Sequence, residues 1–212
     1  MVTHDQFEQL RSSYQPQVPP DLRDCALVDV ISDAEPLMVD PEVKEDIQFS
    51  QLCEYGKLDF GKIESPKAGK SAQRVGVVLS GGPASGGHNV IAGLFDGLKE
   101  IMPENELIGF MGGPIGIVNN DAMAIDEKLV SYHRNLGGFS LLGTGRTKLE
   151  TAEDFERAIE TARHHQLNAF VICGGDDSNT NAALMAAYFS KHAPDIRVLG
   201  VPKTIDADLR GK

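Results

Sequence analysis

The stretch that decides the fold is NAFVICGGDDSNTN, residues 168–181. Its first six residues, 168–173, form a short apolar run rich in β-formers, as expected for a strand that is covered on both faces. Residues 182–189 then form an unbroken run of apolar residues and alanine that predicts a helix, with Ser178 as its N-cap. A strand, a two-glycine turn and a helix expose backbone N–H groups that can hold an anion, which points to phosphate chemistry.

Two adjacent carboxylates in this turn, Asp176 and Asp177, make the phosphate hypothesis more specific. Carboxylates beside a phosphate repel it unless a cation such as Mg²⁺ lies between them. One carboxylate can serve the metal, and the other then needs a separate role. The alternative is that both residues only cap the helix.

Composition limits the possible classes of protein. The 212 residues are 41% hydrophobic, which predicts either one sizeable core or one domain plus an extension. The formal net charge is −11. Without a long basic run, nucleic acid is not an expected partner. No apolar run of about 18 residues and no signal-peptide pattern is present, so we expect a cytoplasmic protein without a membrane span. The three cysteines fit neither a disulfide framework nor a zinc site.

Residues 1–72 differ in composition from the rest of the chain. They are rich in acidic residues and proline, yet they contain too many apolar residues for a simply disordered segment. We therefore predict an N-terminal extension over 1–72, which packs on or beside the main domain and is joined to it by a linker at 65–71. The main domain is predicted over 73–212.

From residue 74 onward, apolar strand patterns alternate with amphipathic helical patterns. The helix after residue 151 has a capping-box pattern in Thr151 and Asp154. This alternation predicts an α/β fold with three layers, a mostly parallel sheet with helices on both faces. The predicted strands are 74–80, 107–111, 169–173 and 197–201.

Several turns are predicted to meet at one edge of this sheet. In open α/β sheets the ligand lies outside the carboxyl ends of the strands. The glycine-rich turns 81–87 and 112–114, the aspartate turn 174–178 and the segment 202–208 all leave strands at that edge. For 112–114, tight backbone packing is an equally good explanation.

The segment 202–208, PKTIDAD, supplies groups for phosphoryl transfer to a sugar hydroxyl. Asp206 and Asp208 are two residues apart, so in an extended stretch both lie on one face. Such a transfer needs a base near the hydroxyl and a cation on the transferred group. Asp206 can be the base, Lys203 the cation and Thr204 a hydroxyl donor.

The segment 143–148, GTGRTK, is a further candidate for contact with phosphate. A glycine-flanked arginine offers a planar fork of donors to an anion. Arg146 and Lys148 could instead belong to a solvated surface loop.

Taken together, these motifs resemble the phosphofructokinase family, and within it the pyrophosphate-dependent branch. The resemblance covers about residues 74–212. It rests on GGDDS at 174–178 followed by PKTID at 202–206, supported by SGG at 80–82, GGHN at 86–89 and GTGRT at 143–147. ATP-using relatives usually have glycine in place of Asp177 and lack the lysine at Lys203.

The resemblance implies reversible, Mg²⁺-dependent phosphoryl transfer from pyrophosphate to the 1-hydroxyl of fructose 6-phosphate. Asp206 would be the base, Asp176 would hold Mg²⁺, and Lys203 would bind the transferring phosphate. Independently of the resemblance, like-charge repulsion predicts that Asp177 excludes the α-phosphate of a nucleotide. The resemblance also implies donor contacts from Gly82, Arg146, Ser178 and Asn179, and a sugar side formed by Thr204, Asp206 and Asp208.

Family members continue through a second α/β domain, so this chain is expected to be an N-terminal portion that is inactive alone. The complete protein is expected to be a homodimer or a higher homo-oligomer. Three alternatives remain: an ATP-dependent 6-phosphofructokinase of the same fold, a related NAD or lipid kinase, and a non-catalytic regulatory subunit. Asp177 and Lys203 disfavour the first, segment 202–208 disfavours the second, and retention of the base and lysine disfavours the third.

Overall fold

The computed structural model describes residues 6, 9, 29–30, 63–64, 71–134, 136, 139–203 and 205. Of the predicted N-terminal extension it describes little beyond one antiparallel pair, β1 (Asp29–Val30) with β2 (Ile63–Glu64). The rest of the extension and most of the predicted linker lie outside the described residues.

The main sheet has the strand order β5-β4-β3-β6-β7. Neighbours β4, β3, β6 and β7 run parallel, which confirms the prediction of a mostly parallel α/β sheet. The fifth strand, β5, pairs antiparallel with β4 at one edge and was not predicted. The bounds are β3 Arg74–Leu79, β4 Glu106–Phe110, β5 Ala122–Ile125, β6 Ala169–Gly174 and β7 Arg197–Pro202.

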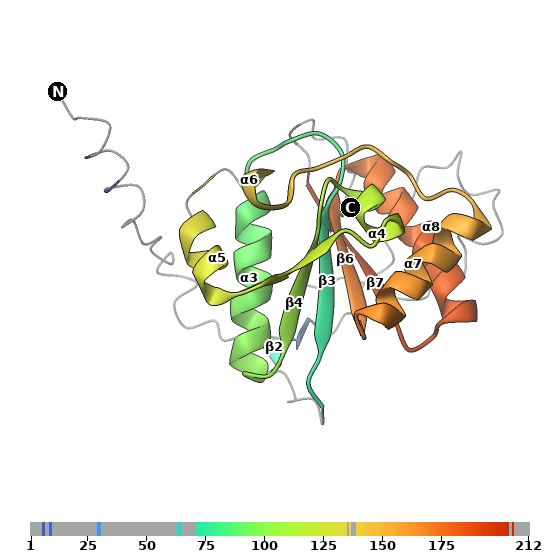
Figure 1. The fold of residues 1–212 in the computed structure, drawn as a ribbon, viewed down its shortest axis with the longest axis horizontal. Helices are drawn as coiled ribbons and strands as arrows, with labels where there is room; N and C mark the ends of the chain where they lie inside the picture. The colour runs from blue at the N-terminus through green and yellow to red at the C-terminus, as the bar shows by residue number, and fades with distance from the viewer. Residues whose placement is uncertain are drawn as a thin grey trace.

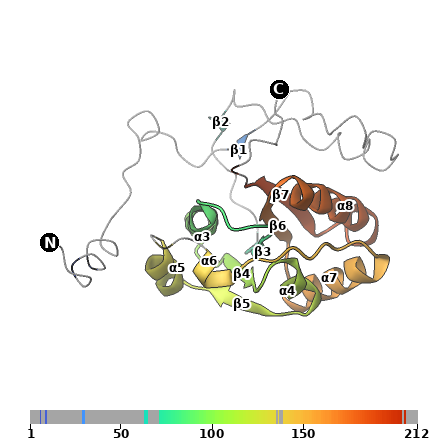
Figure 2. The ribbon, with the colours of Figure 1, turned by 90° about the horizontal axis from the view of Figure 1, so that it is seen from above.

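Helices cover both faces of the sheet, as predicted (Figures 1 and 2). Helices α3, α5 and α6 lie on one side, and α4, α7 and α8 lie on the other. Their bounds are α3 Gly87–Ile101, α4 Pro114–Val118, α5 Glu127–His133, α6 Phe139–Leu142, α7 Ala152–His164 and α8 Asp176–His192. Within the described residues, no helix is long and apolar enough to cross a membrane.

The two layers of core packing follow from alternation along the strands. On β3, Val77 and Leu79 pack with α3 residues such as Phe95, while Val78 points to the opposite face. There Val78 joins a cluster with Phe155 of α7 and other residues of α7 and α8. Because successive side chains of a strand point to opposite faces, each central strand contributes to both clusters.

The order of the strands positions the functional edge. After β3 the chain crosses through α3 to β4 on one side, whereas β6 lies on the other side of β3. At such a reversal the loops that leave two adjacent strands diverge and leave a crevice at the carboxyl ends. The turns after β3 and β6 therefore face one another.

Two local predictions about helix starts had different outcomes. Helix α7 begins with the predicted capping box, since Thr151 accepts from the backbone N–H of Asp154 and Asp154 accepts from that of Thr151. The prediction of Ser178 as the N-cap of α8 was wrong. The N-cap is Gly175, and Ser178 lies inside the first helical turn, because the helix begins at Asp176.

Candidate functional site

A cleft of about 590 Å³ lies at the carboxyl ends of the parallel strands. Four segments far apart in the sequence form its lining: the turn after β3, the loop before α7, the start of α8 and the chain just after β7. Its lining residues are Ser80, Gly81, Gly82, Pro83, Ala84, Arg146, Thr147, Lys148, Gly175, Asp176, Asp177, Ser178, Asn181, Lys203 and Ile205.

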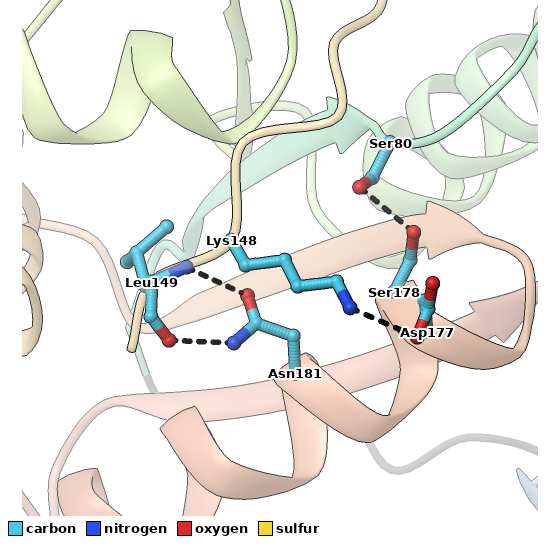
Figure 3. Close-up of polar contacts among 6 residues, drawn as sticks. All are labelled: Ser80, Lys148, Leu149, Asp177, Ser178 and Asn181. Atoms are coloured by element: carbon cyan, nitrogen blue, oxygen red, sulfur yellow. Dashed lines mark hydrogen bonds and ion pairs between the residues drawn. The ribbon is translucent and has the colours of Figure 1, made fainter. Parts of the chain in front are cut away.

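The floor of the cleft is a buried hydrogen bond between its two central turns. The Ser178 hydroxyl donates to the Ser80 hydroxyl oxygen over 2.8 Å, and both residues are buried (Figure 3). Close contact at Gly174 makes this possible, since a Cβ on Gly174 would lie 2.3 Å from Ser178 Cβ. Ser178 thus lines the cleft with its hydroxyl engaged by the protein, and its predicted contact with the donor stays a prediction.

Asp176 and Asp177 occupy the first turn of α8, and both line the cleft as exposed residues. Asp177 forms an ion pair with Lys148, whose Nζ donates to Asp177 Oδ1 over 3.0 Å (Figure 3). The hydrogen bond to Asp177 is the main cause of a raised pKa for the Lys148 ammonium, which therefore stays charged. In the described part of the chain, the Asp176 carboxylate has no such partner.

Two asparagines of α8 hold the backbone around the cleft. Asn181 forms a reciprocal pair with Leu149, accepting from its N–H at 3.1 Å and donating to its carbonyl oxygen at 2.6 Å. Asn179 donates to the carbonyl oxygens of Gly174 and Gly175, both at 2.7 Å. Asn179 is not among the cleft-lining residues, so its predicted contact with the donor stays a prediction, and its amide here braces the turn.

The glycine turn after β3 adopts a backbone conformation that suits glycine. Gly81 has a φ of +86°, a backbone conformation that residues other than glycine rarely adopt. Its N–H donates to the carbonyl oxygen of Gly145 at 2.8 Å, and the Thr144 hydroxyl lies 2.8 Å from the Gly81 carbonyl oxygen. The turn is thus fastened to the 143–147 loop, which brings the two predicted phosphate-binding segments together.

Arg146 lies over this turn, with a guanidinium nitrogen 3.4 Å from the position that a Cβ on Gly82 would occupy. Arg146 is exposed and, among the described residues, forms no ion pair. A cleft-facing guanidinium without a partner is free to bind an anion with its planar fork of donors. The structure therefore brings Gly82 and Arg146 together, and their predicted contacts with the donor stay predictions.

The turn 112–114 has a packing role. A Cβ on Gly113 would lie 2.3 Å from the backbone nitrogen of Gly145, and a Cβ on Gly145 would lie 2.2 Å from the carbonyl oxygen of Gly112. None of residues 112–114 lines the cleft. Their predicted convergence on the site is therefore indirect, through support of the 143–147 loop.

Lys203 closes the cleft from the end of β7. Its backbone N–H donates to the Gly174 carbonyl oxygen at 2.7 Å, and its Nζ donates to the Gly82 carbonyl oxygen at 2.5 Å. The ammonium also lies 5.6 Å from the ring centroid of Phe139 in α6, a cation–π distance. The lysine thus spans the turns after β3 and β6.

Thr204, Asp206 and Asp208, the predicted base and sugar-side residues, lie outside the described residues. Between them Ile205 lines the cleft and is 76% exposed. The predicted roles of these three residues remain predictions.

The carboxylates of the cleft fit Mg²⁺ in a mostly hydrated form. No three His, Cys, Asp or Glu side chains among the described residues gather into a cluster that could enclose a metal. Mg²⁺ does not need one, since it keeps several waters and commonly uses one or two carboxylates together with substrate phosphates. The Asp176 carboxylate, which has no ion-pair partner among the described residues, fits that mode.

Sequence reasoning missed three features of the site. These are the buried Ser80 partner of Ser178, the Asn181 bracket on Leu149 and the Phe139 ring beside Lys203. Each joins residues more than 30 positions apart, so no local spacing could reveal it. Asn181 itself carried no distinguishing signal, since it ends the polar stretch 176–181 just before the apolar run of α8.

Comparisons with known proteins identify relatives of this chain. Residues 74–212 match the family described as Phosphofructokinase. The chain is 47% identical over 208 residues to pyrophosphate–fructose 6-phosphate 1-phosphotransferase of Entamoeba histolytica, across 95% of this chain and 37% of that protein. It is 53% identical over 139 residues to the protein of the same name from Treponema pallidum, across 66% of this chain and 24% of that protein.

A likeness in fold extends to solved structures. The crystal structure of pyrophosphate-dependent phosphofructokinase from Nitrosospira multiformis superposes with a TM-score of 0.55 at 21% identity, over 64% of this chain and 35% of that one. The chain thus spans between about a quarter and little more than a third of the length of these relatives. Since the family match extends over the whole α/β unit and its cleft, the chain belongs to the phosphofructokinase family.

Proposed function

We propose that the cleft binds pyrophosphate as a phosphoryl donor, and that the complete protein transfers a phosphoryl group to the 1-hydroxyl of fructose 6-phosphate. Fructose 1,6-bisphosphate and phosphate are the products, and the reaction is reversible. The observation that carries the proposal is the placement of Asp176, Asp177 and Lys203 around one cleft at the start of α8. The names of the relatives from Entamoeba and Treponema support the same donor and acceptor.

The donor phosphates meet three kinds of group in this proposal. The N-terminus of α8 supplies N–H groups and a positive dipole end, which favour an anion. Arg146 supplies its fork of donors, and the Lys203 ammonium would stabilise the charge that develops on the transferred group. Asp176 would hold Mg²⁺, which supplies charge neutralisation between the phosphates and the carboxylate.

The acceptor side rests on Asp206. Its carboxylate takes the proton of the sugar 1-hydroxyl as that oxygen bonds to phosphorus, while the bond from phosphorus to the leaving phosphate breaks. The leaving phosphate keeps the bonding electron pair. Thr204 and Asp208 bind the sugar beside the base.

The proposal includes a cytoplasmic location, where fructose 6-phosphate is available, and a homo-oligomeric complete protein.

Donor choice follows from Asp177. A nucleotide extends beyond its second phosphate, and that extension would meet the carboxylate at the cleft's rim. Two like charges about 4 Å apart repel by roughly 4 kcal/mol at an effective dielectric near 20. The ion pair with Lys148 lowers this repulsion energy. The paired side chains also obstruct the nucleotide's extension sterically, and this second effect does not depend on charge. Pyrophosphate has no extension and avoids both effects.

The test is a turnover assay of the complete polypeptide that carries this sequence, with fructose 6-phosphate and either pyrophosphate or ATP. We expect fructose 1,6-bisphosphate with pyrophosphate and at least about a hundredfold lower kcat/KM with ATP. Asp206→Ala is the control that ties turnover to this site, with kcat lowered about 10²- to 10⁴-fold. Faster turnover with ATP than with pyrophosphate would refute the donor assignment.

A further inference from the structure

The rim of the cleft carries an ion pair that joins two of its walls. Lys148 extends from the loop before α7, and Asp177 extends from the first turn of α8 (Figure 3). Their side chains are 45% and 73% exposed, whereas Ser80 and Ser178 on the floor are buried. The pair therefore lies at the solvent side of the cleft, above the phosphate-binding turn.

Two buried hydrogen bonds join the same two segments next to the ion pair. Leu149 follows Lys148 in the chain, and Asn181 lies one helical turn after Asp177 in α8. The amide of Asn181 holds both the N–H and the carbonyl oxygen of Leu149, and both residues are buried. The backbones that carry Lys148 and Asp177 are thus fixed relative to each other, so the ion pair forms between two anchored ends.

This anchoring matters because an exposed aspartate is otherwise mobile. Asp177 has Lys148 as its one ion-pair partner within the described residues. Without it, the carboxylate could rotate into solvent and leave the rim open. A fixed partner on the opposite wall holds it across the cleft.

We propose that Lys148 is a positioning residue for donor specificity, which holds the Asp177 carboxylate across the rim so that the pair blocks the extension of a nucleotide. This inference rests on the proposed function. Positioning differs from neutralisation alone, because the two roles predict opposite changes in nucleotide affinity when Lys148 is removed. If Lys148 only neutralised Asp177, its removal would strengthen repulsion and weaken nucleotide binding. If Lys148 holds the barrier in place, its removal opens the rim and strengthens nucleotide binding.

Binding to the complete polypeptide, measured by calorimetry with Mg²⁺–pyrophosphate and with Mg²⁺–ATP, tests the proposal without requiring turnover. The variants are Lys148→Met, Asp177→Gly and the double variant. Lys191→Met is the matched control, since Lys191 is an exposed lysine near the C-terminal end of α8 and does not line the cleft. The readout is the ratio of the Kd for ATP to the Kd for pyrophosphate.

We expect Lys148→Met to lower that ratio about two- to fivefold, the range set by the modest strength of partly exposed ion pairs. In the Asp177→Gly background the same change should have no effect beyond that of Lys191→Met, because no carboxylate remains to position. If Lys148→Met leaves the ratio unchanged or raises it in the protein that keeps Asp177, the proposal is overturned. So would an equal change in both backgrounds, which would indicate that Lys148 contacts the donor directly.

Failure of this inference is separable from failure of the proposed function. The proposed function fails if the unaltered polypeptide does not use pyrophosphate in the turnover assay. The positioning role fails if the binding ratio does not depend on Lys148 through Asp177, whatever the turnover assay gives.

Discussion

Lys203 Nζ donates to the carbonyl oxygen of Gly82, a residue 121 positions earlier in the chain. The contact ties the end of β7 to the turn after β3, with the start of α8 between them. It places the ammonium inside the cleft and leaves it further donors, since an ammonium has three. The same lysine is therefore available to a phosphate without leaving its site.

Lys203→Met should lower kcat with pyrophosphate about 10²- to 10³-fold, the usual cost of removing one group that stabilises developing charge. Methionine keeps the length and the packing near Phe139 but removes the charge. Steady-state kinetics of the complete polypeptide would measure the loss, with Lys191→Met as the surface control. A kcat within about threefold of the unaltered protein would show that Lys203 does not serve the transferred group.

Gly174→Ala should destabilise the fold by about 1–3 kcal/mol, because the added methyl group overlaps Ser178 Cβ and the Ser80 carbonyl oxygen. Gly93→Ala is a control of opposite sign. Gly93 is in the interior of α3, and a Cβ added there would meet nothing within 4 Å, so alanine should stabilise by about 0.4–1 kcal/mol. Urea unfolding curves would measure both, and equal stabilities of the two variants would contradict the packing described at the cleft floor.

Asp154→Ala should destabilise by about 1 kcal/mol at pH 7 through loss of the capping box of α7. Hydrogen bonds from Thr151 hold the pKa of the Asp154 carboxyl below its ordinary value. A carboxyl whose pKa is lower in the folded state stabilises above its unfolded pKa, and this contribution is lost as the pH falls through the folded value. The difference between the variant and the unaltered protein should therefore shrink below about pH 4.

Glu160→Ala is the matched control, since it removes an exposed carboxylate from the same helix. Its effect on the free energy of unfolding should be within about 0.5 kcal/mol at every pH. A pH-independent loss in Asp154→Ala would mean that the carboxylate does not supply the capping energy.

The sequence predicted those parts of the fold that have a local periodic signal. The strands at 74–79 and 169–174 are buried on both faces, so they appear as continuous apolar runs, and the amphipathic helices around them fix the layer order. Strand β5 was missed because AMAI, residues 122–125, is short and carries no strong β-former pattern. Its direction is antiparallel because the connection from β4 to β5, through the short helix α4, is too short for the crossover that a parallel pair requires.

The site was predicted as far as its residues follow strands directly. Gly82, Asp176 and Lys203 each lie just after a parallel strand, so topology alone brings them to one edge. Side-chain partners were not predictable in this way. The Lys148–Asp177 pair depends on how far the loop before α7 reaches across that edge. The Ser80–Ser178 hydrogen bond depends on how closely the start of α8 packs on the end of β3. Sequence spacing encodes neither.

The central claim, that this cleft takes pyrophosphate because Asp177 excludes nucleotides, is tested most directly by Asp177→Gly in the complete polypeptide. The measurement is kcat/KM with pyrophosphate and with ATP, at saturating fructose 6-phosphate and Mg²⁺. Glycine removes both the carboxylate and the rim contact with Lys148, so we expect kcat/KM for ATP to rise at least about tenfold while that for pyrophosphate falls. No gain with ATP and no loss with pyrophosphate would mean that Asp177 only stabilises the start of α8, and the account of donor choice would be wrong.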